Sequence, residues 1–464
     1  MTALELAAAI RAGDLSAREA LDGCLAAVDR TNDEVNAVIW RDDDAARATA
    51  DALEGSALPF GGVPIPVKDL NLAIGQPAYY GSRGAPEGQR DQDEAVIAAF
   101  RRAGFIPTAR TNVPEFGLIP IAENLRFGVS RNPWNTDHTP GGSSGGAAAA
   151  VAAGMFPAAH ANDGGGSIRI PASCCGLVGL KPSRGRVPKA VQSWEGAVVE
   201  GVVTRDVADT AAILDEIAAD DAAAWMRLPA PERPYRDEVG ADPGKLRIGL
   251  MATGPQGLPV DDECATAARN AGRALEQLGH EVTEVDVPTL SEELTPAFIV
   301  LTRAGLADYP DVDWTKVEPH IAAQHAAAEA VSSLTYIEAG RILQLASREL
   351  LARWDDFDVL VTPTMAIVPP RAGDIVPKSH AAPEEPVLEV IQLVAFAAFA
   401  NITGQPAISL PLHWSAEGLP VGVQLVGPPA GEGLLLRLSG QLEQALPWAD
   451  RRPPVWAGQE APTS

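Results

Sequence analysis

The sequence contains few cysteines, few lysines and no long hydrophobic run. Its four cysteines include the adjacent Cys174 and Cys175 and form no CxxC pair, which argues against a disulfide framework and against a zinc site. No run of about eighteen apolar residues is present, so we expect no membrane-spanning helix. Residues 1–12 lack a basic segment and a small-residue cleavage site. We therefore expect a reduced, cytoplasmic protein without a metal or other cofactor.

Positive charge is also scarce. The 464 residues include 36 lysines and arginines against 61 aspartates and glutamates, a formal net charge of −25. Such an acidic chain is poorly suited to bind nucleic acid or an anionic membrane, and we expect a small-molecule ligand instead. The composition is also compatible with a homodimer. The apolar fraction of 46% excludes disorder and is sufficient for a large core.

Short apolar runs alternate with helical patterns, which predicts an α/β protein with a layered sheet. The predicted strands cover 63–67, 105–108, 156–160, 245–251, 357–361, 407–410 and 421–426. The predicted helices cover 93–103, 147–153, 261–278 and 432–446, with two more within 3–30. Strands lie on both sides of a glycine-rich centre, so we expect one domain over 1–464. Its predicted parts are N-terminal helices in 1–60, a catalytic core in 61–206, a surface excursion at 225–245 and the rest of the sheet in 246–464.

Two glycine-rich turns, GGSSGG at 141–146 and GGGS at 164–167, lie in this centre. Glycine adopts positive φ without strain, so such turns can direct several backbone N–H groups at one anion. The phosphate-binding pattern GxxxxGK[ST] is missing from the sequence. The other anion that needs these donors is the oxyanion of an acyl-transfer intermediate. Ser167, beside the second turn, is then a candidate nucleophile.

Two common serine-hydrolase patterns fit poorly. Ser143 and Ser144 both satisfy GxSxG, but a nucleophile elbow follows an apolar strand, and residues 132–140 are polar and bounded by prolines. This argues against a triad that uses His380 or His413. The SxxK pattern of β-lactamase-like enzymes is also missing, because no lysine has a serine three residues before it.

Lys68 ends the apolar run 63–67 in a chain that otherwise uses mainly arginine. An arginine stays charged in proteins, whereas a desolvated lysine can lose its proton and act as a base. Taken alone, Lys68 fits better the simpler interpretation, a lysine that ends a strand and extends its amine to water.

Four segments resemble the amidase signature family over nearly the whole chain: VPIPVKDL at 63–70, the block 139–188, FDVLVTPT at 357–364 and NITGQPAISLP at 401–411. The resemblance implies an α/β/α fold, with a large twisted mixed sheet surrounded by helices. It also implies a Ser-Ser-Lys triad, in which Lys68 is the lysine, Ser143 the bridging serine and Ser167 the nucleophile. The peptide between Gly142 and Ser143 is expected to be cis.

The mechanism implied by the resemblance begins with attack of Ser167 on the carbonyl carbon. Its proton passes to Ser143, which neutral Lys68 supports, and returns to the leaving nitrogen, which suits amides and carbamates. The expected oxyanion donors are the backbone N–H groups of Gly164, Gly165, Gly166 and Ser167. Supporting roles are expected for Asp163 and Arg169, as a pair that holds the loop, and for Ser144, as a hydrogen-bond donor or helix cap.

One position bears on the substrate. Family members that release ammonia from glutamine carry an aspartate seven positions before the asparagine of NxxGxP, where this chain has Val394. With Phe396 and Phe399 nearby, this predicts an apolar acyl pocket. We expect an amidase for hydrophobic or ω-amino acyl amides, including nylon-type oligomers, or for aryl carbamates. The alternatives are an inactive scaffold, which the filled triad positions disfavour, and a glutamine-hydrolysing amidotransferase subunit.

Overall fold

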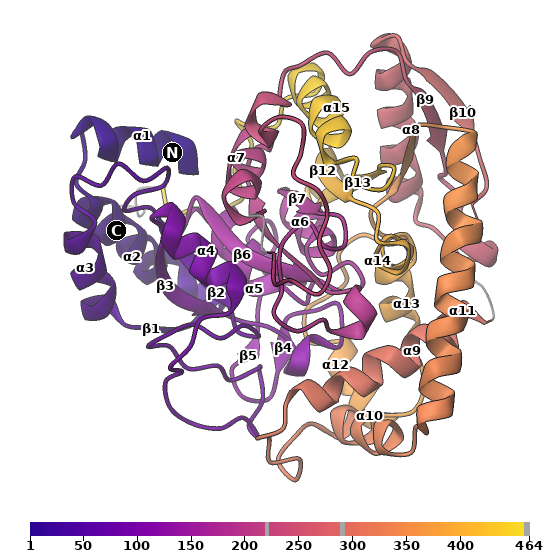
Figure 1. Ribbon diagram of the computed structural model, residues 1–464, viewed down its shortest axis with the longest axis horizontal. Coiled ribbons are helices and arrows are strands. Elements are labelled where there is room, and N and C mark those ends of the chain that lie inside the picture. The colour runs from indigo at the N-terminus through magenta and orange to yellow at the C-terminus, as the bar shows by residue number, and fades with distance from the viewer. Residues whose placement is uncertain (219–221, 288–292, 459–464) are drawn as a thin grey trace.

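A mixed eight-stranded sheet forms the centre of the computed structural model, which describes residues 1–218, 222–287 and 293–458 (Figure 1). Its strand order is β10-β9-β11-β13-β12-β7-β8-β6. Strand β9 pairs in parallel with β10 and β11, and the other neighbours are antiparallel. The strands are β6 (Ala158–Asp163), β7 (Val178–Lys181), β8 (Val199–Thr204), β9 (Arg247–Leu250), β10 (Glu281–Glu284), β11 (Val359–Pro363), β12 (Ala407–Trp414) and β13 (Pro420–Val426). The expected mixed sheet is thus confirmed.

Two smaller sheets accompany the large one. Strands β1 (Val38–Arg41), β3 (Ile106–Thr111) and β2 (Pro64–Lys68) form one in the order β1-β3-β2, and β4 (Glu123–Asn124) pairs with β5 (Gly128–Val129). Strand β2 is buried along its whole length and contacts β6, so it carries Lys68 from the small sheet to the edge of the large one.

Helices surround the sheets. They are α1 (Ala3–Ala12), α2 (Ala17–Val35), α3 (Asp43–Ala52), α4 (Ala95–Ala103), α5 (Gly145–Ala152), α6 (Arg169–Cys175), α7 (Val207–Ile217), α8 (Asp262–Gln277), α9 (Leu294–Ala304), α10 (Pro319–Glu329), α11 (Ser333–Ala352), α12 (Ile375–Ala381), α13 (Leu388–Val394), α14 (Ala398–Thr403) and α15 (Glu432–Ala445). Among the described residues, no helix is long and apolar enough to cross a bilayer.

The alternation of β11 shows why helices cover both faces of the sheet. Val359 and Val361 pack with residues of α7, α8 and α15, whereas Leu360 packs on the other side with Phe396 and Phe399. Successive side chains of a strand point to opposite faces, so each face needs its own apolar cover. Helices α5 and α6 add to the second cover with residues that are buried throughout, including Cys174 and Cys175.

The predicted elements recur with shifted ends. Strand β6 was expected at 156–160 but runs from Ala158 to Asp163, because Asn162 and Asp163 find buried partners and can continue the strand. Helices α9, α10 and α11 were not predicted. In the expected surface excursion at 225–245, Trp225 is exposed while Tyr235 is buried in the main core.

Candidate active site

Three elements bring polar side chains together beside one cavity of about 450 Å³. Lys68 ends β2, Ser143 precedes α5, and Ser167 follows the loop after β6. Ser143 and Ser167 both line the cavity, and Lys68 lies behind them with no exposed surface. The peptide between Gly142 and Ser143 is cis. The residues that the sequence predicted for the triad therefore meet in one place.

The Lys68 amine has three close partners. Its Nζ is 2.8 Å from Ser143 Oγ, 2.6 Å from Asn162 Oδ1 and 3.3 Å from the Asn162 carbonyl oxygen. Burial lowers the pKa of Lys68 from 10.5 to about 7, although the charges of Glu200 and Asp163 oppose this effect. A buried amine with this pKa is partly neutral near pH 7 and can accept a proton.

A low lysine pKa alone does not locate the site. Burial also lowers the pKa of Lys181 to about 7, but the Nζ of Lys181 donates to the Pro182 carbonyl and Lys181 does not line the cavity. Only Lys68, of these two, contacts a serine at the cavity surface. The contact, not the pKa, distinguishes the candidate base.

The turn after β6 is held by a buried ion pair. The Nη2 and Nε of Arg169 are each 2.9 Å from the Asp163 carboxylate, and neither side chain has exposed surface. Burial on its own would raise the pKa of Asp163, but Arg169 and the charge of Lys181 hold it well below its usual range. The Asp163 carboxylate also accepts the N–H groups of Gly166 (2.7 Å) and Ile168 (3.1 Å).

This geometry changes the expected set of oxyanion donors. The N–H of Gly166 is already donated to Asp163, and Gly166 has φ of 129°, in the range that favours glycine. Its place in the turn is therefore to shape the loop rather than to bind an oxyanion. Gly164, Gly165 and Ser167 remain as candidate donors.

Two side chains that contact the candidate site were missed by the sequence analysis. Asn162 contacts Lys68 and, through its Nδ2, donates to Asn71 Oδ1 at 3.0 Å. Asn401 donates to Asp163 and accepts from Arg169 at 2.6 Å, so it joins the loop to α14. Asn162 lies in the polar end of β6, directly before the glycine-rich turn, and this position is the signal that could have revealed the first.

Ser144 lies next to Ser143 but has another contact. Its Oγ donates to the Asn162 carbonyl at 3.2 Å, and it makes no side-chain cap at the start of α5. The two histidines considered for a conventional triad pair elsewhere: His380 with Glu318 and His413 with Glu263. Neither lines the cavity with the serines.

The structure does not place the three residues predicted for the acyl pocket at the cavity. Phe396 and Phe399 are fully buried in a core cluster behind the sheet, Val394 packs against a second cluster, and none of the three lines the cavity. Their apolar side chains cover the sheet face, which sequence spacing could not distinguish from a pocket wall. The cavity walls instead include Tyr80, Phe116, Leu118, Trp194, Leu306 and Tyr309.

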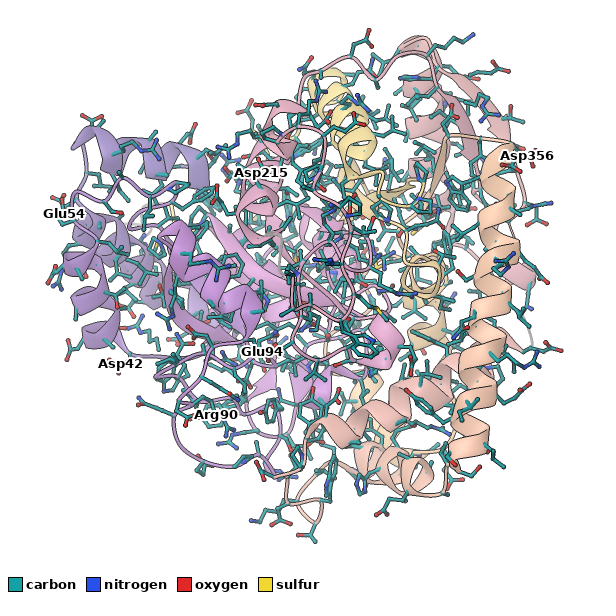
Figure 2. All side chains as sticks on the ribbon, viewed as in Figure 1. Asp42, Glu54, Arg90, Glu94, Asp215 and Asp356 are labelled. Carbon is teal, nitrogen blue, oxygen red and sulfur yellow. The ribbon has the colours of Figure 1, made fainter. Side chains whose placement is uncertain are left out.

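Charged groups also line the cavity. They are Asp93, Glu94, Lys189, Glu200 and Asp308, of which only Lys189 is basic. Lys189 pairs with Glu200. In the view of Figure 2, Glu94 lies near the middle of the outline of the molecule, whereas Asp42 and Asp356 lie at its outer edge. Burial raises the pKa of Glu94, and the charge of Glu200 acts in the same direction.

We expect replacement of Arg169 by methionine to reduce the free energy of unfolding by about 3–5 kcal/mol, because it leaves the Asp163 carboxylate buried without its counter-ion. Urea denaturation followed by circular dichroism measures this change. The matched control is Arg18→Met, which removes an exposed ion pair with Asp51 and should change stability little. Equal effects of the two substitutions would contradict the role of the buried pair.

Comparison with known proteins agrees with this geometry. The protein family described as Amidase matches residues 19–436. The 6-aminohexanoate-cyclic-dimer hydrolase of Pseudomonas sp. (strain NK87) is 37% identical over 476 residues, covering 96% of this chain and 94% of that protein. A solved structure of a 6-aminohexanoate cyclic dimer hydrolase with substrate has a TM-score of 0.92 at 33% identity, covering 98% of this chain and 99% of that one.

Two further solved structures are similar. A bacterial aryl acylamidase of the amidase signature family has a TM-score of 0.88 at 26% identity and covers 99% of both chains. A glutamyl-tRNA(Gln) amidotransferase chain of Thermotoga maritima has a TM-score of 0.79 at 25% identity, covering 99% of this chain and 98% of that one.

The fold and the family are those of a hydrolase that acts on amide C–N bonds. The chain belongs to the amidase family, in its amidase signature group.

Proposed function

We propose that Ser167 is the nucleophile, that Ser143 and Lys68 relay its proton, and that an acyl-enzyme forms and is then hydrolysed. The observation that carries the proposal is the 2.8 Å contact of Lys68 Nζ with the Oγ of Ser143, which lines the same cavity as Ser167. A nucleophile needs a base within reach and a group that orients the base. Ser143 and Lys68 fill these positions.

The surroundings of Lys68 favour acceptance of a proton from Ser143. A neutral amine has two N–H donors and one lone pair. Asn162 offers two acceptors, its side-chain and main-chain oxygens, at 2.6 and 3.3 Å. When both N–H groups point to Asn162, the lone pair is left for the Ser143 hydroxyl. Asn162 is itself fixed by Asn71, whose Nδ2 donates to Glu94 at 2.9 Å.

The oxyanion of the tetrahedral intermediate needs donors that are fixed before the reaction. We assign this role to the N–H groups of Gly164, Gly165 and Ser167. Support comes from the Asp163–Arg169 pair, which fixes the turn through contacts with Gly166, Ile168 and Asn401. The proton that Ser143 holds then passes to the leaving nitrogen, since an amine leaves poorly unless protonated.

The cavity walls favour an acyl group with an apolar body and no negative charge. Aromatic and aliphatic side chains line the cavity, and its charged residues comprise four acids and one lysine that is already paired. We propose a hydrophobic or ω-amino acyl amide as the substrate, because the acids can accept an ammonium group at the far end of the chain. Aryl carbamates have the same apolar character.

Glutamine should be a poor substrate. Its carboxylate would enter a cavity where acidic groups outnumber basic ones, so we expect kcat/KM for hexanamide and 6-aminohexanamide to exceed that for glutamine at least tenfold, about 1.4 kcal/mol. Steady-state kinetics on the chain alone measure the ratio, with an acyl anilide and an aryl carbamate as further substrates. If glutamine is the best substrate, the amidotransferase interpretation replaces ours.

We also propose that the chain acts as a single domain in the cytoplasm. The N-terminal helix is joined to the core, because the Ala3 and Leu4 N–H groups donate to the Asp209 carboxylate of α7 at 2.5 and 2.9 Å.

All four cysteines are free, which agrees with a reducing compartment. A homodimer stays a prediction that light scattering tests.

A further inference from the structure

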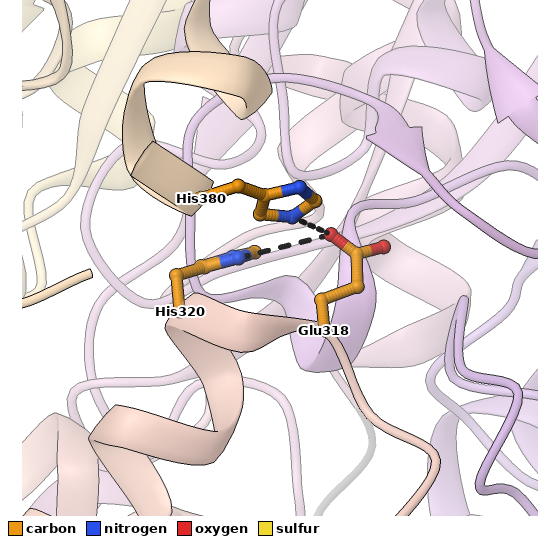
Figure 3. Close-up of side chains that lie close together, drawn as sticks. All are labelled: Glu318, His320 and His380. Carbon is orange, nitrogen blue, oxygen red and sulfur yellow. Dashed lines mark hydrogen bonds and ion pairs between the residues drawn. The ribbon is translucent and has the colours of Figure 1, made fainter. Parts of the chain in front are cut away.

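Glu318, His320 and His380 form a cluster outside the active-site cavity (Figure 3). Glu318 immediately precedes α10, His320 lies in its first turn, and His380 lies in α12. One ligand-type atom from each lies within 4.8 Å of the others. His380 Nε2 is 2.9 Å and His320 Nδ1 is 3.7 Å from the same oxygen, Oε2 of Glu318.

His320 is the unusual member of the cluster. Its side chain is buried, with 5% exposure, and neither ring nitrogen has a hydrogen-bond partner among the described residues. A buried polar group without a partner is unfavourable, so such a group needs an explanation. The imidazole ring of His320 therefore has a ring nitrogen available to bind a cation.

Three buried carboxyl groups in this region have no lysine or arginine partner among the described residues. Glu115, Glu123 and Glu318 are each at most 2% exposed, and among the described residues none of them pairs with a lysine or arginine. The Oε2 of Glu123 also has no hydrogen-bond partner there. Buried carboxylates without a counter-ion are unfavourable, and a cation would remove this cost.

We propose that Glu318, His320 and His380 bind one divalent transition-metal ion of the zinc type. Two imidazoles and one carboxylate suit Zn²⁺, whereas Mg²⁺ and Ca²⁺ prefer oxygen ligands. Bonds of about 2.0–2.1 Å in tetrahedral geometry separate two ligand atoms by about 3.3 Å, between the 2.9 and 3.7 Å distances of this cluster. His380, with a side chain 20% exposed, provides the route for the ion from solvent.

The ion would join α10 to α12 and thereby stabilise one wall of the active-site cavity. Ile321, next to His320 in α10, packs in a cluster with Phe116 and Leu306, and these two residues line the cavity. The three ligands do not line it. The ion is therefore structural, and the serine mechanism proposed above does not depend on it.

The test uses the full chain without a polyhistidine tag, stripped with a chelator and dialysed against Zn²⁺. Elemental analysis should find one equivalent of zinc per chain, and the melting temperature should rise with Zn²⁺ but not with Mg²⁺. Co²⁺ in place of Zn²⁺ should give the visible absorption of a tetrahedral site. Removal of a group that hydrogen-bonds to a metal ligand weakens metal binding about 10–100-fold. Removal of a ligand itself, as in His380→Ala, should weaken zinc binding at least as much.

The matched control is His325→Ala. His325 also lies in α10, but its ring stacks on Trp314 at 3.8 Å and belongs to no cluster with Glu318. This variant should keep one equivalent of zinc. His320→Gln supplies a second test if the alanine variant does not fold. Absence of stoichiometric zinc in the wild type, or unchanged zinc content in both His380→Ala and His320→Gln, would overturn the proposal.

Discussion

Replacement of Ser167 by alanine should reduce kcat for an acyl anilide by a factor of about 10⁴ or more, with little change in fold. The reason is that the proposed covalent route loses its attacking atom, while the cavity and the Lys68–Ser143 contact remain. Steady-state kinetics measure the loss, and circular dichroism with thermal melting checks the fold.

The control for this prediction is Ser144→Ala, which removes the neighbouring hydroxyl that also satisfies GxSxG. It loses only the 3.2 Å hydrogen bond to the Asn162 carbonyl, so activity should stay within about tenfold of the wild type, at about 1 kcal/mol per neutral hydrogen bond. The reverse order, with Ser144→Ala inactive and Ser167→Ala active, would identify an elbow-type nucleophile instead.

Replacement of Lys68 by arginine should be nearly as damaging as replacement by alanine, with kcat/KM reduced about 10²–10⁴-fold in both. Arginine keeps a positive charge, but it cannot deprotonate and so cannot accept the Ser143 proton. A Lys68→Met variant, uncharged and of similar length, separates loss of the base from loss of folding. An arginine variant with most of the wild-type activity would remove Lys68 from the mechanism.

The pH dependence follows from the lowered pKa of Lys68. Since the neutral amine is the active form, log kcat/KM should rise by one unit per pH unit below about pH 7 and level off above it. Asn162→Asp places a carboxylate at the 2.6 Å contact, which stabilises the ammonium and should move the midpoint to higher pH. A midpoint that does not move would show that the profile reports another group.

Much of the fold could be predicted because the periodicity of the core is strong. The helix at Ala17 is marked by the Ser16–Glu19 capping box, which the structure contains, and β11 by an apolar run. Helices α9 to α11 were harder to predict from the sequence, because several of their apolar residues, such as Leu334 and Ile337, are exposed and do not mark a buried helix face.

The residues of the site could be predicted only where they lie close together in the sequence. Ser143 and Ser167 lie in glycine-rich turns, and Asp163 and Arg169 flank one of them. Asn401 joins the same loop from a distant segment, and such a contact leaves no local pattern. Phe396 and Phe399 were predicted in a pocket wall but lie in the core, because an apolar run fits a core and a pocket wall equally well.

The cluster of Glu318, His320 and His380 shows the same limit. Two of its members lie on separate helices and Glu318 precedes one of them, so no short motif such as HExxH contains all three. The sequence therefore led us to expect no metal. The proximity arises only when α10 and α12 pack together.

Mass-spectrometric mapping of a fluorophosphonate adduct tests the central claim most directly. The reagent phosphonylates only an activated serine, so peptide analysis of the labelled wild type identifies the nucleophile without reference to any substrate. We expect a single adduct on Ser167, slow labelling of the Lys68→Met variant and no labelling of Ser167→Ala. An adduct on Ser143 or Ser144, or undiminished labelling of Ser167→Ala, would contradict the account.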